Sequence, residues 1–270
     1  MEKLSVVICV YNEELNIRPL ADQIRAALRG MDYEAIFVDD GSTDKTRSEI
    51  LALDDDRFVL VELMRNYGQS SALQAGIDAA RGDYIVLIDG DLQNDPADIP
   101  DMLELAETEG WDMVAGVRAH RKDGMVLRKI PSAIANYMIR QLTGTQMKDL
   151  GCTLKLFTAE AIKQVHIYGE LHRFIPVLAA LEGATRFTQV DVNHRPRQFG
   201  RSKYNLSRTT RVLSDLTLMW FFKKYMQRPM HFFGQIGFFT LAVGIVINLY
   251  LLALKIAGND IWGKPLLLLG

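Results

Sequence analysis

The feature that most constrains this chain is an apolar segment near its C-terminal end. From Phe232 to Leu254, 23 consecutive residues carry no charge, and apolar side chains would lie on every face of a helix formed there. Such a helix extends about 35 Å, enough to cross the ~30 Å hydrocarbon core of a bilayer. A buried core helix is the alternative, but core helices seldom reach this length. We therefore predict a membrane span, and its distance from the N-terminus excludes a signal peptide.

A basic segment precedes the predicted span. Residues 195–230 contain nine Lys or Arg and one acid, whereas the whole 270-residue chain has a net charge of −2. Aromatic and apolar residues such as Trp220 are interspersed with this charge, which predicts an amphipathic helix at the lipid headgroups. An ordinary surface helix with a solvated basic face is the alternative. Because basic residues beside a span stay on the cytoplasmic side, we expect the N-terminal domain in the cytoplasm.

Three segments follow from this charge pattern. We expect a cytoplasmic domain over 1–200, a basic juxtamembrane segment over 201–230 and a transmembrane region over 231–270. The last segment ends in Lys264-Pro-Leu-Leu-Leu-Leu-Gly, which resembles either the start of a second span or a short re-entrant piece. The sequence leaves both open.

Composition excludes several classes of protein. With 49% hydrophobic and 24% charged residues, the chain is not disordered. Its two cysteines cannot form a disulfide framework or a four-cysteine zinc site, and they fit a reducing compartment. The five histidines lack the HExxH spacing of zinc hydrolases. The slightly acidic balance argues against nucleic acid as the main partner.

The N-terminal half alternates between strand-like and helix-like segments, which predicts an α/β fold with a mostly parallel sheet covered on both faces. The predicted strands are 4–10, 34–38, 58–63, 84–88 and 112–117. The predicted helices are 14–28, 43–53 and 70–80, the second of them capped by Ser42 or Thr43. In such sheets, ligands bind beyond the carboxyl ends of the strands.

Five carboxylates follow three of these predicted strands directly. They occur in Tyr11-Asn12-Glu13, in Asp39-Asp40-Gly41-Ser42 and in Asp89-Gly90-Asp91-Leu92-Gln93. Any one of them alone would be an ordinary loop acid. Together, neighbouring like charges raise one another's free energy, and a divalent cation relieves this repulsion. The pattern therefore predicts Mg²⁺ or Mn²⁺ shared with substrate phosphates, with the small Gly90 leaving room for a ligand.

Six blocks in order along nearly the whole chain resemble the polyprenyl-phosphate glycosyltransferases, a group within glycosyltransferase family 2 that has the GT-A fold. The blocks are SVVICVYNEE, VDDGSTDKT, NYGQSSALQAG, DGDLQNDP, DLGCTLKLF and FGRSKYNLSR. The resemblance implies inverting transfer of a sugar from a nucleotide-sugar to a membrane polyprenyl phosphate. The chain departs from the family at Cys9, where proline is usual, and in its single complete span, where bacterial members usually have two.

The resemblance also implies roles for individual residues. The donor would be bordered by Cys9, Tyr11, Glu13, Val38, Asp39, Asp40, Gly90 and Arg118. The metal would be held by Asp89, Asp91 and Gln93, and the acceptor phosphate by Arg128 and Ser132. Arg201 and Lys203 would close over the diphosphate and act with Asp89 and Asp91 in catalysis.

Elementary chemistry agrees with these roles. A departing nucleoside diphosphate gains negative charge, which a metal ion and basic side chains stabilise. The acceptor phosphate has a second pKa of about 6, so it attacks as a dianion and needs no strong general base.

Two alternatives to this function differ in class. A processive polysaccharide synthase of the same fold would carry a QxxRW motif, which is missing from this sequence. A membrane scaffold without activity would not need the carboxylates. We favour a UDP-sugar, undecaprenyl phosphate and a bacterial inner membrane, with GDP-mannose, dolichyl phosphate and a homo-oligomer left open.

Overall fold

The protein is seen here as a computed structural model that describes residues 3–118, 147–169, 171–199, 221, 224–225 and 228–258. The chain divides into two compact units, Met1–Leu216 and Thr217–Gly270. Each unit is described by itself. The segment boundaries at residues 200 and 230 stay predictions.

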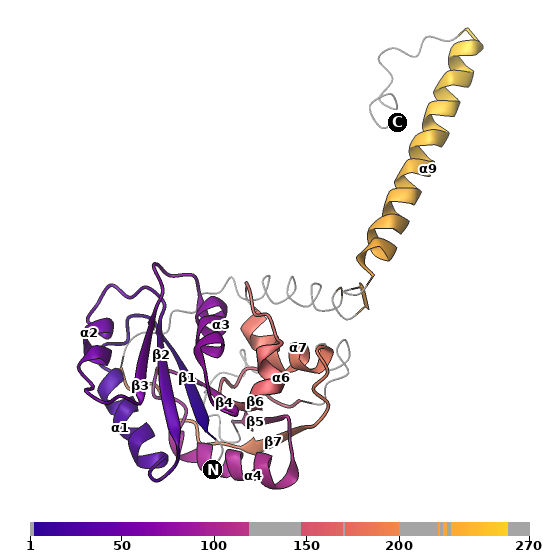
Figure 1. The fold of residues 1–270 in the computed structure, drawn as a ribbon. Coiled ribbons are helices and arrows are strands. Elements are labelled where there is room, and N and C mark those ends of the chain that lie inside the picture. The colour runs from indigo at the N-terminus through magenta and orange to yellow at the C-terminus, as the bar shows by residue number, and fades with distance from the viewer. Residues whose placement is uncertain are drawn as a thin grey trace. The chain divides into compact units, whose positions relative to one another are not determined.

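The first unit is an α/β domain (Figure 1). Its strands are β1 (Leu4–Val10), β2 (Tyr33–Asp39), β3 (Phe58–Glu62), β4 (Tyr84–Asp89), β5 (Met113–Val117), β6 (Lys155–Thr158) and β7 (Phe187–Asp191). Its helices are α1 (Ile17–Ala27), α2 (Thr46–Leu51), α3 (Gln69–Ala79), α4 (Ile99–Glu109), α6 (Ala159–Lys163) and α7 (Ile175–Leu181). Two short 3₁₀ helices are η1 (Pro96–Asp98) and η2 (Leu171–Phe174).

The strands of the described residues form one sheet in the order β3-β2-β1-β4-β6-β5-β7. Strands β1 to β4 run parallel to one another, β6 runs antiparallel to both β4 and β5, and β7 is parallel to β5. The predicted mostly parallel sheet is therefore confirmed. The carboxyl ends of β1, β2 and β4 lie side by side at one edge, because these strands are neighbours in the sheet.

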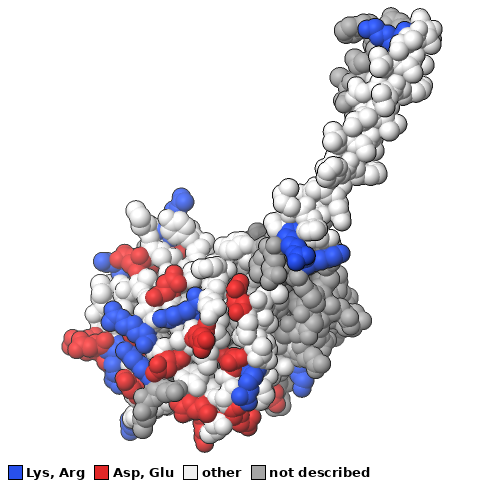
Figure 2. Space-filling view, turned by 45° about the vertical axis from the view of Figure 1, so that its right-hand side comes forward, with Lys and Arg blue, Asp and Glu red and all other residues white. Residues whose placement is uncertain are grey.

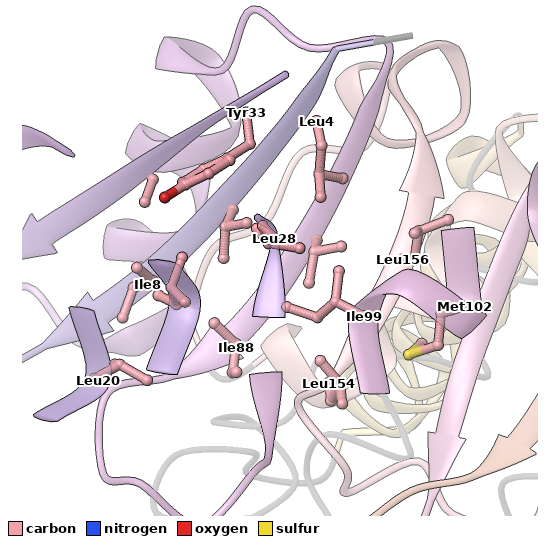
Figure 3. Packing of buried hydrophobic residues seen from close by; sticks show 14 of the residues in the cluster. Leu4, Ile8, Leu20, Leu28, Tyr33, Ile88, Ile99, Met102, Leu154 and Leu156 are labelled. Carbon is pink, nitrogen blue, oxygen red and sulfur yellow. The ribbon is translucent and has the colours of Figure 1, made fainter. Parts of the chain in front are cut away.

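Apolar periodicity explains how the helices cover this sheet. Helix α1 buries Ile17, Leu20 and Ile24 at helical spacing, in the same cluster as alternate residues of β1 and with side chains of α4 (Figure 3). Helix α3 packs on β1 and β2 from the opposite face, where Gly76 lies against Val7. A Cβ on Gly76 would lie 2.3 Å from Cγ1 of Val7, so this close approach requires glycine.

All five predicted strands and all three predicted helices are confirmed, with bounds shifted by a few residues. The prediction that Ser42 or Thr43 caps the second helix is wrong. Helix α2 begins at Thr46, whose amide donates to Oδ1 of Asp44 over 2.9 Å. The elements η1 and α4, and those from β6 to β7, were not predicted, because they fall outside the regular strand–helix repeat.

The second unit contains α9 (Pro229–Ile256), a helix of 28 residues. Within the described part of the chain it is the one helix long and apolar enough to cross a membrane, with a mean hydropathy of 2.2 and almost no burial inside the protein. It is nearly free of charge along its length (Figure 2). The helical prediction for this segment is confirmed. Most of the predicted amphipathic segment over 201–230 lies outside the described residues.

Candidate active site

The strand register brings the predicted site residues together. Cys9, near the end of β1, lies opposite Val38 of β2 on one side and opposite Asp89 of β4 on the other. Val10 lies opposite Asp39, and the next amide, that of Asp40, donates to the carbonyl of Val10 over 3.0 Å. The carboxylates that were separated in sequence therefore share one edge of the sheet, as predicted.

Asp39 and Asp40 hold the loops around them. The buried carboxylate of Asp40 accepts the amides of Tyr67 and Gly68 over 2.7 and 2.9 Å. Burial raises the pKa of Asp40, although these two hydrogen bonds oppose the rise. The neighbouring Asp39 accepts the amide of Ser42 over 2.9 Å. These two acids thus fix the shape of the edge on which a nucleotide would lie.

A second set of bonds joins the ends of β1 and β2. The side-chain oxygen of Asn12 accepts the amide of Thr43 over 2.7 Å, while the amide of Asn12 donates to the Ser42 hydroxyl over 2.9 Å. Asn12 has a positive φ of 52°, a conformation that asparagine tolerates better than most residues. Tyr11, which precedes it, is half-buried at the same edge.

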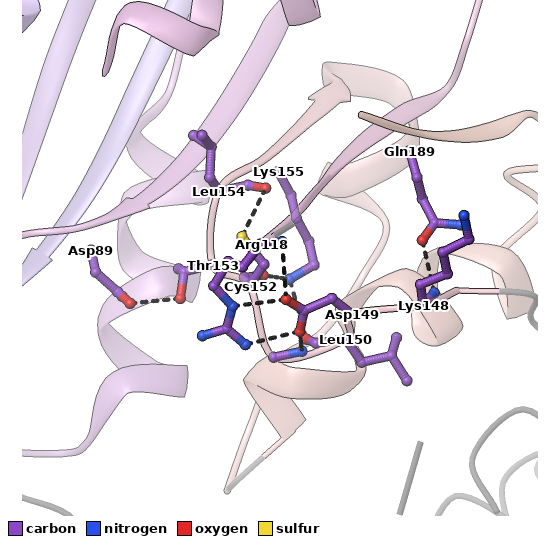
Figure 4. A network of polar contacts seen from close by, with 11 residues as sticks. Asp89, Arg118, Lys148, Asp149, Leu150, Cys152, Thr153, Leu154, Lys155 and Gln189 are labelled. Carbon is purple, nitrogen blue, oxygen red and sulfur yellow. Dashed lines mark hydrogen bonds and ion pairs between the residues drawn. The ribbon is translucent and has the colours of Figure 1, made fainter. Parts of the chain in front are cut away.

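Both carboxylate oxygens of Asp89 accept hydrogen bonds. Its Oδ1 accepts a hydrogen bond from the side-chain amide of Gln69 over 2.8 Å. Its Oδ2 accepts one from the Thr153 hydroxyl over 2.6 Å (Figure 4). Burial raises the pKa of Asp89 to about 6, and the negative charge of nearby Asp91 adds to the rise. This repulsion between two carboxylates is the feature that a cation would relieve.

Asp91 pairs with an arginine that follows β7 in the chain. The guanidinium of Arg197 lies 2.7 Å from Oδ2 of Asp91 and 3.0 Å from Oε1 of Glu13. Oδ1 of Asp91 accepts the amide of Gln93 over 3.1 Å. The Gln93 side chain donates to the carbonyl of Arg195 over 3.4 Å.

The charge count over 195–230 therefore includes two arginines that pair with acids of the first unit, and both precede the predicted start of the juxtamembrane segment at residue 201. Arg197 binds Asp91 and Glu13, and Arg195 pairs with Asp95. Counting charge along the chain could not reveal that these two arginines neutralise acids of the domain.

The turn between the two acids depends on close packing. A Cβ on Gly90 would lie 2.5 Å from Cγ1 of Val10, so only glycine fits there. Leu92 is fully buried and has a positive φ of 61°, an unfavourable conformation for leucine. Burial of the Leu92 side chain holds the strained turn that presents Asp91.

These residues fit a divalent cation. Asp89 and Asp91 supply hard oxygen ligands beside each other, and such a site takes its remaining ligands from substrate phosphates and water. Among the described residues, no group of three or more His, Cys, Asp or Glu is arranged to hold a metal by itself.

A second set of charged residues lies next to Asp89. Arg118, at the end of β5, donates two hydrogen bonds to Asp149, over 2.7 and 2.8 Å (Figure 4). Burial raises the pKa of Asp149, but the bonds from Arg118 outweigh it and the net pKa is lowered. Lys155 of β6 is buried and donates to the carbonyls of Leu150 and Cys152, and burial lowers its pKa.

The structure places most of the predicted residues but not all. Cys9, Tyr11, Glu13, Val38, Asp39, Asp40, Asp89, Gly90, Asp91, Gln93 and Arg118 all lie at or beside this edge. Arg128, Ser132, Arg201 and Lys203 lie outside the described residues. Sequence reasoning missed Gln69, Asp149, Thr153, Lys155 and Arg197. Four of these five are polar residues in the blocks NYGQSSALQAG and DLGCTLKLF. Their position in these blocks could have marked them as candidate site residues.

The fold and this edge define a nucleotide-dependent transferase of the GT-A type, and the chain belongs to glycosyl transferase family 2. Residues 5–165 match the sequence profile of that family. The identification made from the six blocks is confirmed.

Two relatives within this family have names that specify a substrate. The chain is 46% identical to "Dodecaprenyl-phosphate galacturonate synthase" of Rhizobium johnstonii, over 99% of this chain and 81% of the relative. It is 36% identical to "Undecaprenyl-phosphate 4-deoxy-4-formamido-L-arabinose transferase" of Yersinia pestis, over 97% of this chain and 79% of the relative.

Among solved structures, the fold is similar to glucosyl-3-phosphoglycerate synthase of Mycobacterium tuberculosis in complex with Mn²⁺, UDP-glucose and phosphoglyceric acid. The TM-score is 0.64 at 21% identity, and the match covers 81% of this chain and 80% of that one. At this identity the likeness supports the fold alone, and it confirms the predicted GT-A architecture.

Proposed function

We propose that this protein transfers a sugar from a nucleotide-sugar to a membrane polyprenyl phosphate, with inversion at the anomeric carbon. The observation that carries the proposal is the extent of the relationship: two relatives named for polyprenyl-phosphate products match 97–99% of the chain. The carboxylate edge of β1, β2 and β4 supports it, since a diphosphate donor needs such a site.

The reaction needs little from the protein beyond binding and charge. An oxygen of the acceptor phosphate attacks the anomeric carbon in line, the bond from that carbon to the diphosphate breaks, and the nucleoside diphosphate leaves. The acceptor dianion carries no proton to remove. A divalent cation at Asp89, Asp91 and Gln93 would neutralise charge on the leaving diphosphate. Arg201 and Lys203 would add positive charge at the diphosphate, and Arg128 and Ser132 would orient the acceptor.

For the donor we propose a UDP-sugar. The ends of β1 and β2, with Cys9, Val38, Asp39 and Asp40, would border the uracil and ribose. The Mycobacterium tuberculosis neighbour holds Mn²⁺ and UDP-glucose, which supports a metal-dependent UDP-sugar reaction in the same fold. The two relatives are named for different sugars, so their names do not select one.

We further propose that α9 spans a bacterial inner membrane and that the first unit works at the cytoplasmic face. The length and the uncharged surface of α9 support this, as do Lys224 and Arg228 just before it. Carbonate extraction of membranes that contain the full chain tests the span, since a peripheral protein would be released. Protease protection in sealed vesicles tests the orientation.

One assay tests the reaction. The full chain in detergent is given undecaprenyl phosphate, Mn²⁺ or Mg²⁺, and one of a panel of UDP-sugars or GDP-mannose, and nucleoside diphosphate release is followed. Release that depends on the lipid and stops with EDTA is the expected result. Release that does not depend on the lipid, or no release from any donor, would contradict the proposal.

A further inference from the structure

A small basic recess adjoins Asp89 on the side away from the nucleotide edge. It is a cavity of about 20 Å³ between α3, the segment before β6, and η2. Gln69 and Thr153, which both bond to Asp89, also form part of its lining. The recess and the proposed metal site therefore share two side chains, and a group bound at one lies next to the other.

The lining of this recess combines apolar side chains with basic ones and contains no acid. Lys155, His172 and Arg173 contribute to it, and no described residue in the lining is Asp or Glu. His172 is held in place by Ser70, whose hydroxyl oxygen lies 3.1 Å from Nδ1 of the ring and accepts the His172 amide over 3.2 Å. Lys155 is occupied by the carbonyls of Leu150 and Cys152.

Arg173 differs from the other arginines around the site. Arg118 is held by Asp149, and Arg197 is held by Asp91 and Glu13. The guanidinium of the half-buried Arg173 has no hydrogen bond or ion pair with any residue in the described ranges. An unpaired, partly desolvated guanidinium in an acid-free recess favours an anionic ligand, because a neutral ligand would leave it without a partner.

The volume of the recess limits which anion can bind in it. The cavity is small, at about 20 Å³, so it suits a single small anionic group better than a whole hexose ring. A carboxylate is planar and matches the fork of one guanidinium with two parallel hydrogen bonds. The recess thus suits one substituent of a sugar whose ring lies outside it, between the recess and the diphosphate at Asp89.

We propose that this recess binds the carboxylate of a uronic acid donor, with Arg173 as the residue that sets donor specificity. The inference rests on the proposed function and adds the chemical class of the sugar. The ring of His172 and the amine of Lys155 lie around the carboxylate, and Gln69 and Thr153 place the recess beside the diphosphate. A neutral hexose would leave Arg173 unpaired in the complex, which lowers its affinity relative to the uronate.

The acceptor phosphate has similar chemistry, so the test must separate the two anions. Full-length enzyme in detergent is assayed with undecaprenyl phosphate and Mn²⁺ on UDP-glucuronate and UDP-galacturonate, and on UDP-glucose and UDP-galactose. We expect kcat/KM for one uronate to exceed that for its neutral counterpart. Arg173→Met should lower kcat/KM for the uronate by about 10- to 100-fold and change that for the neutral sugar by less than about threefold. Arg173→Lys should keep part of the preference, because it keeps the charge without the fork.

Arg29→Met is the matched control. Arg29 is an exposed arginine just after α1, at the opposite edge of the sheet, so the same loss of charge there should leave both donors unaffected. Equal losses on both donors, or a rise in the KM for the lipid alone, would overturn the proposal in favour of a structural or an acceptor role. Melting temperatures of the variants identify any general loss of folding, and Arg173→Gln serves in place of a misfolded Met variant.

A binding measurement separates this inference from the proposed function. Calorimetry compares UDP, UDP-glucuronate, UDP-galacturonate and the two neutral UDP-hexoses on wild type and on Arg173→Met in Mn²⁺. Tighter binding of a uronate than of its hexose, lost in the variant while UDP affinity is retained, supports the recess even if no donor is turned over. Equal affinity of wild type for uronates and hexoses would overturn it even if transfer is observed.

Discussion

The two sides of this site carry opposite charge. The side made by the ends of β1, β2 and β4 is acidic, and its carboxylates are satisfied by backbone amides, by Gln69 and Thr153, and by Arg197. The other side is made by Arg118, Lys155 and Arg173 and is basic. Asp149 satisfies Arg118 and carbonyl groups satisfy Lys155, whereas Arg173 has no hydrogen bond or ion pair within the described residues. The acidic side thus favours binding of a cation, and the basic side favours binding of an anion.

This difference assigns separate tasks to the two sides. A metal–diphosphate complex offers positive charge to the acidic side through the metal and negative charge to its surroundings through the phosphates. The acidic side should therefore control whether any transfer occurs, whereas the basic side should control which donor is used. Each prediction below tests that division.

The largest effect is expected on the acidic side. Asp91→Asn removes one of the two carboxylates at the proposed metal site, and we expect turnover to fall about 1000-fold, because a metal contributes several kcal/mol of charge stabilisation. Initial rates at saturating donor and a Mn²⁺ titration measure it. Asp78→Asn, on the exposed face of α3, is the control and should have no effect. Full activity of Asp91→Asn would remove the metal role from this acid.

On the basic side the large effect should be on stability. Asp149→Asn leaves Arg118 without its bidentate partner, and both side chains are mostly buried, with 15% and 18% exposed. We expect a loss of about 2–3 kcal/mol in unfolding free energy. Glu62→Gln breaks the exposed pair with Arg47 and should cost less than about 0.5 kcal/mol. Thermal unfolding in detergent measures both, and equal losses would contradict the comparison.

The same pair predicts a pH dependence. The folded-state pKa of Asp149 is lowered, so its stabilisation is present above the unfolded pKa and is lost as pH falls through the folded pKa. Between pH 5 and pH 2 the wild type should lose more stability than Asp149→Asn, which has no carboxylate to protonate. Melting temperatures of the two proteins across this range would measure the difference, and parallel curves would contradict it.

The acidic side was predictable from sequence, and the basic side was not. Glu13, Asp40, Asp89 and Asp91 each follow a predicted strand of a regular strand–helix repeat, and parallel strands bring their carboxyl ends to one edge. Lys155 and Arg173 lie in a short antiparallel strand and a 3₁₀ helix, for which no periodic pattern exists in the sequence. Arg197 was missed as a site residue because a count of charge contains no information about which acid faces each cation.

A smaller effect should follow from packing on the acidic side. Gly90→Ala places a methyl 2.5 Å from Cγ1 of Val10, so we expect about 1–3 kcal/mol of destabilisation and weaker binding of UDP and metal. Gly30→Ala meets open space at a positive φ and should affect stability alone. Adding Val10→Ala to Gly90→Ala should restore part of the binding, and a double-mutant cycle by calorimetry measures that coupling. Independent effects of the two substitutions would show that the contact does not set the turn.

The smallest effect concerns Arg197, which pairs with Glu13 and Asp91 on the acidic side. Without a metal, Arg197 is the cation that pairs with Asp91, so a divalent ion that binds Asp91 must compete with its guanidinium. Arg197→Gln should therefore tighten binding of Mn²⁺ in the absence of nucleotide, by about three- to tenfold for a partly exposed pair. Arg195→Gln, which breaks the neighbouring pair with Asp95, should leave Mn²⁺ affinity unchanged. Calorimetric titration of both variants measures the difference. Weaker Mn²⁺ binding by Arg197→Gln would mean that the guanidinium positions Asp91 for the metal instead of competing with it, and the two sides would then share the task of holding the cation.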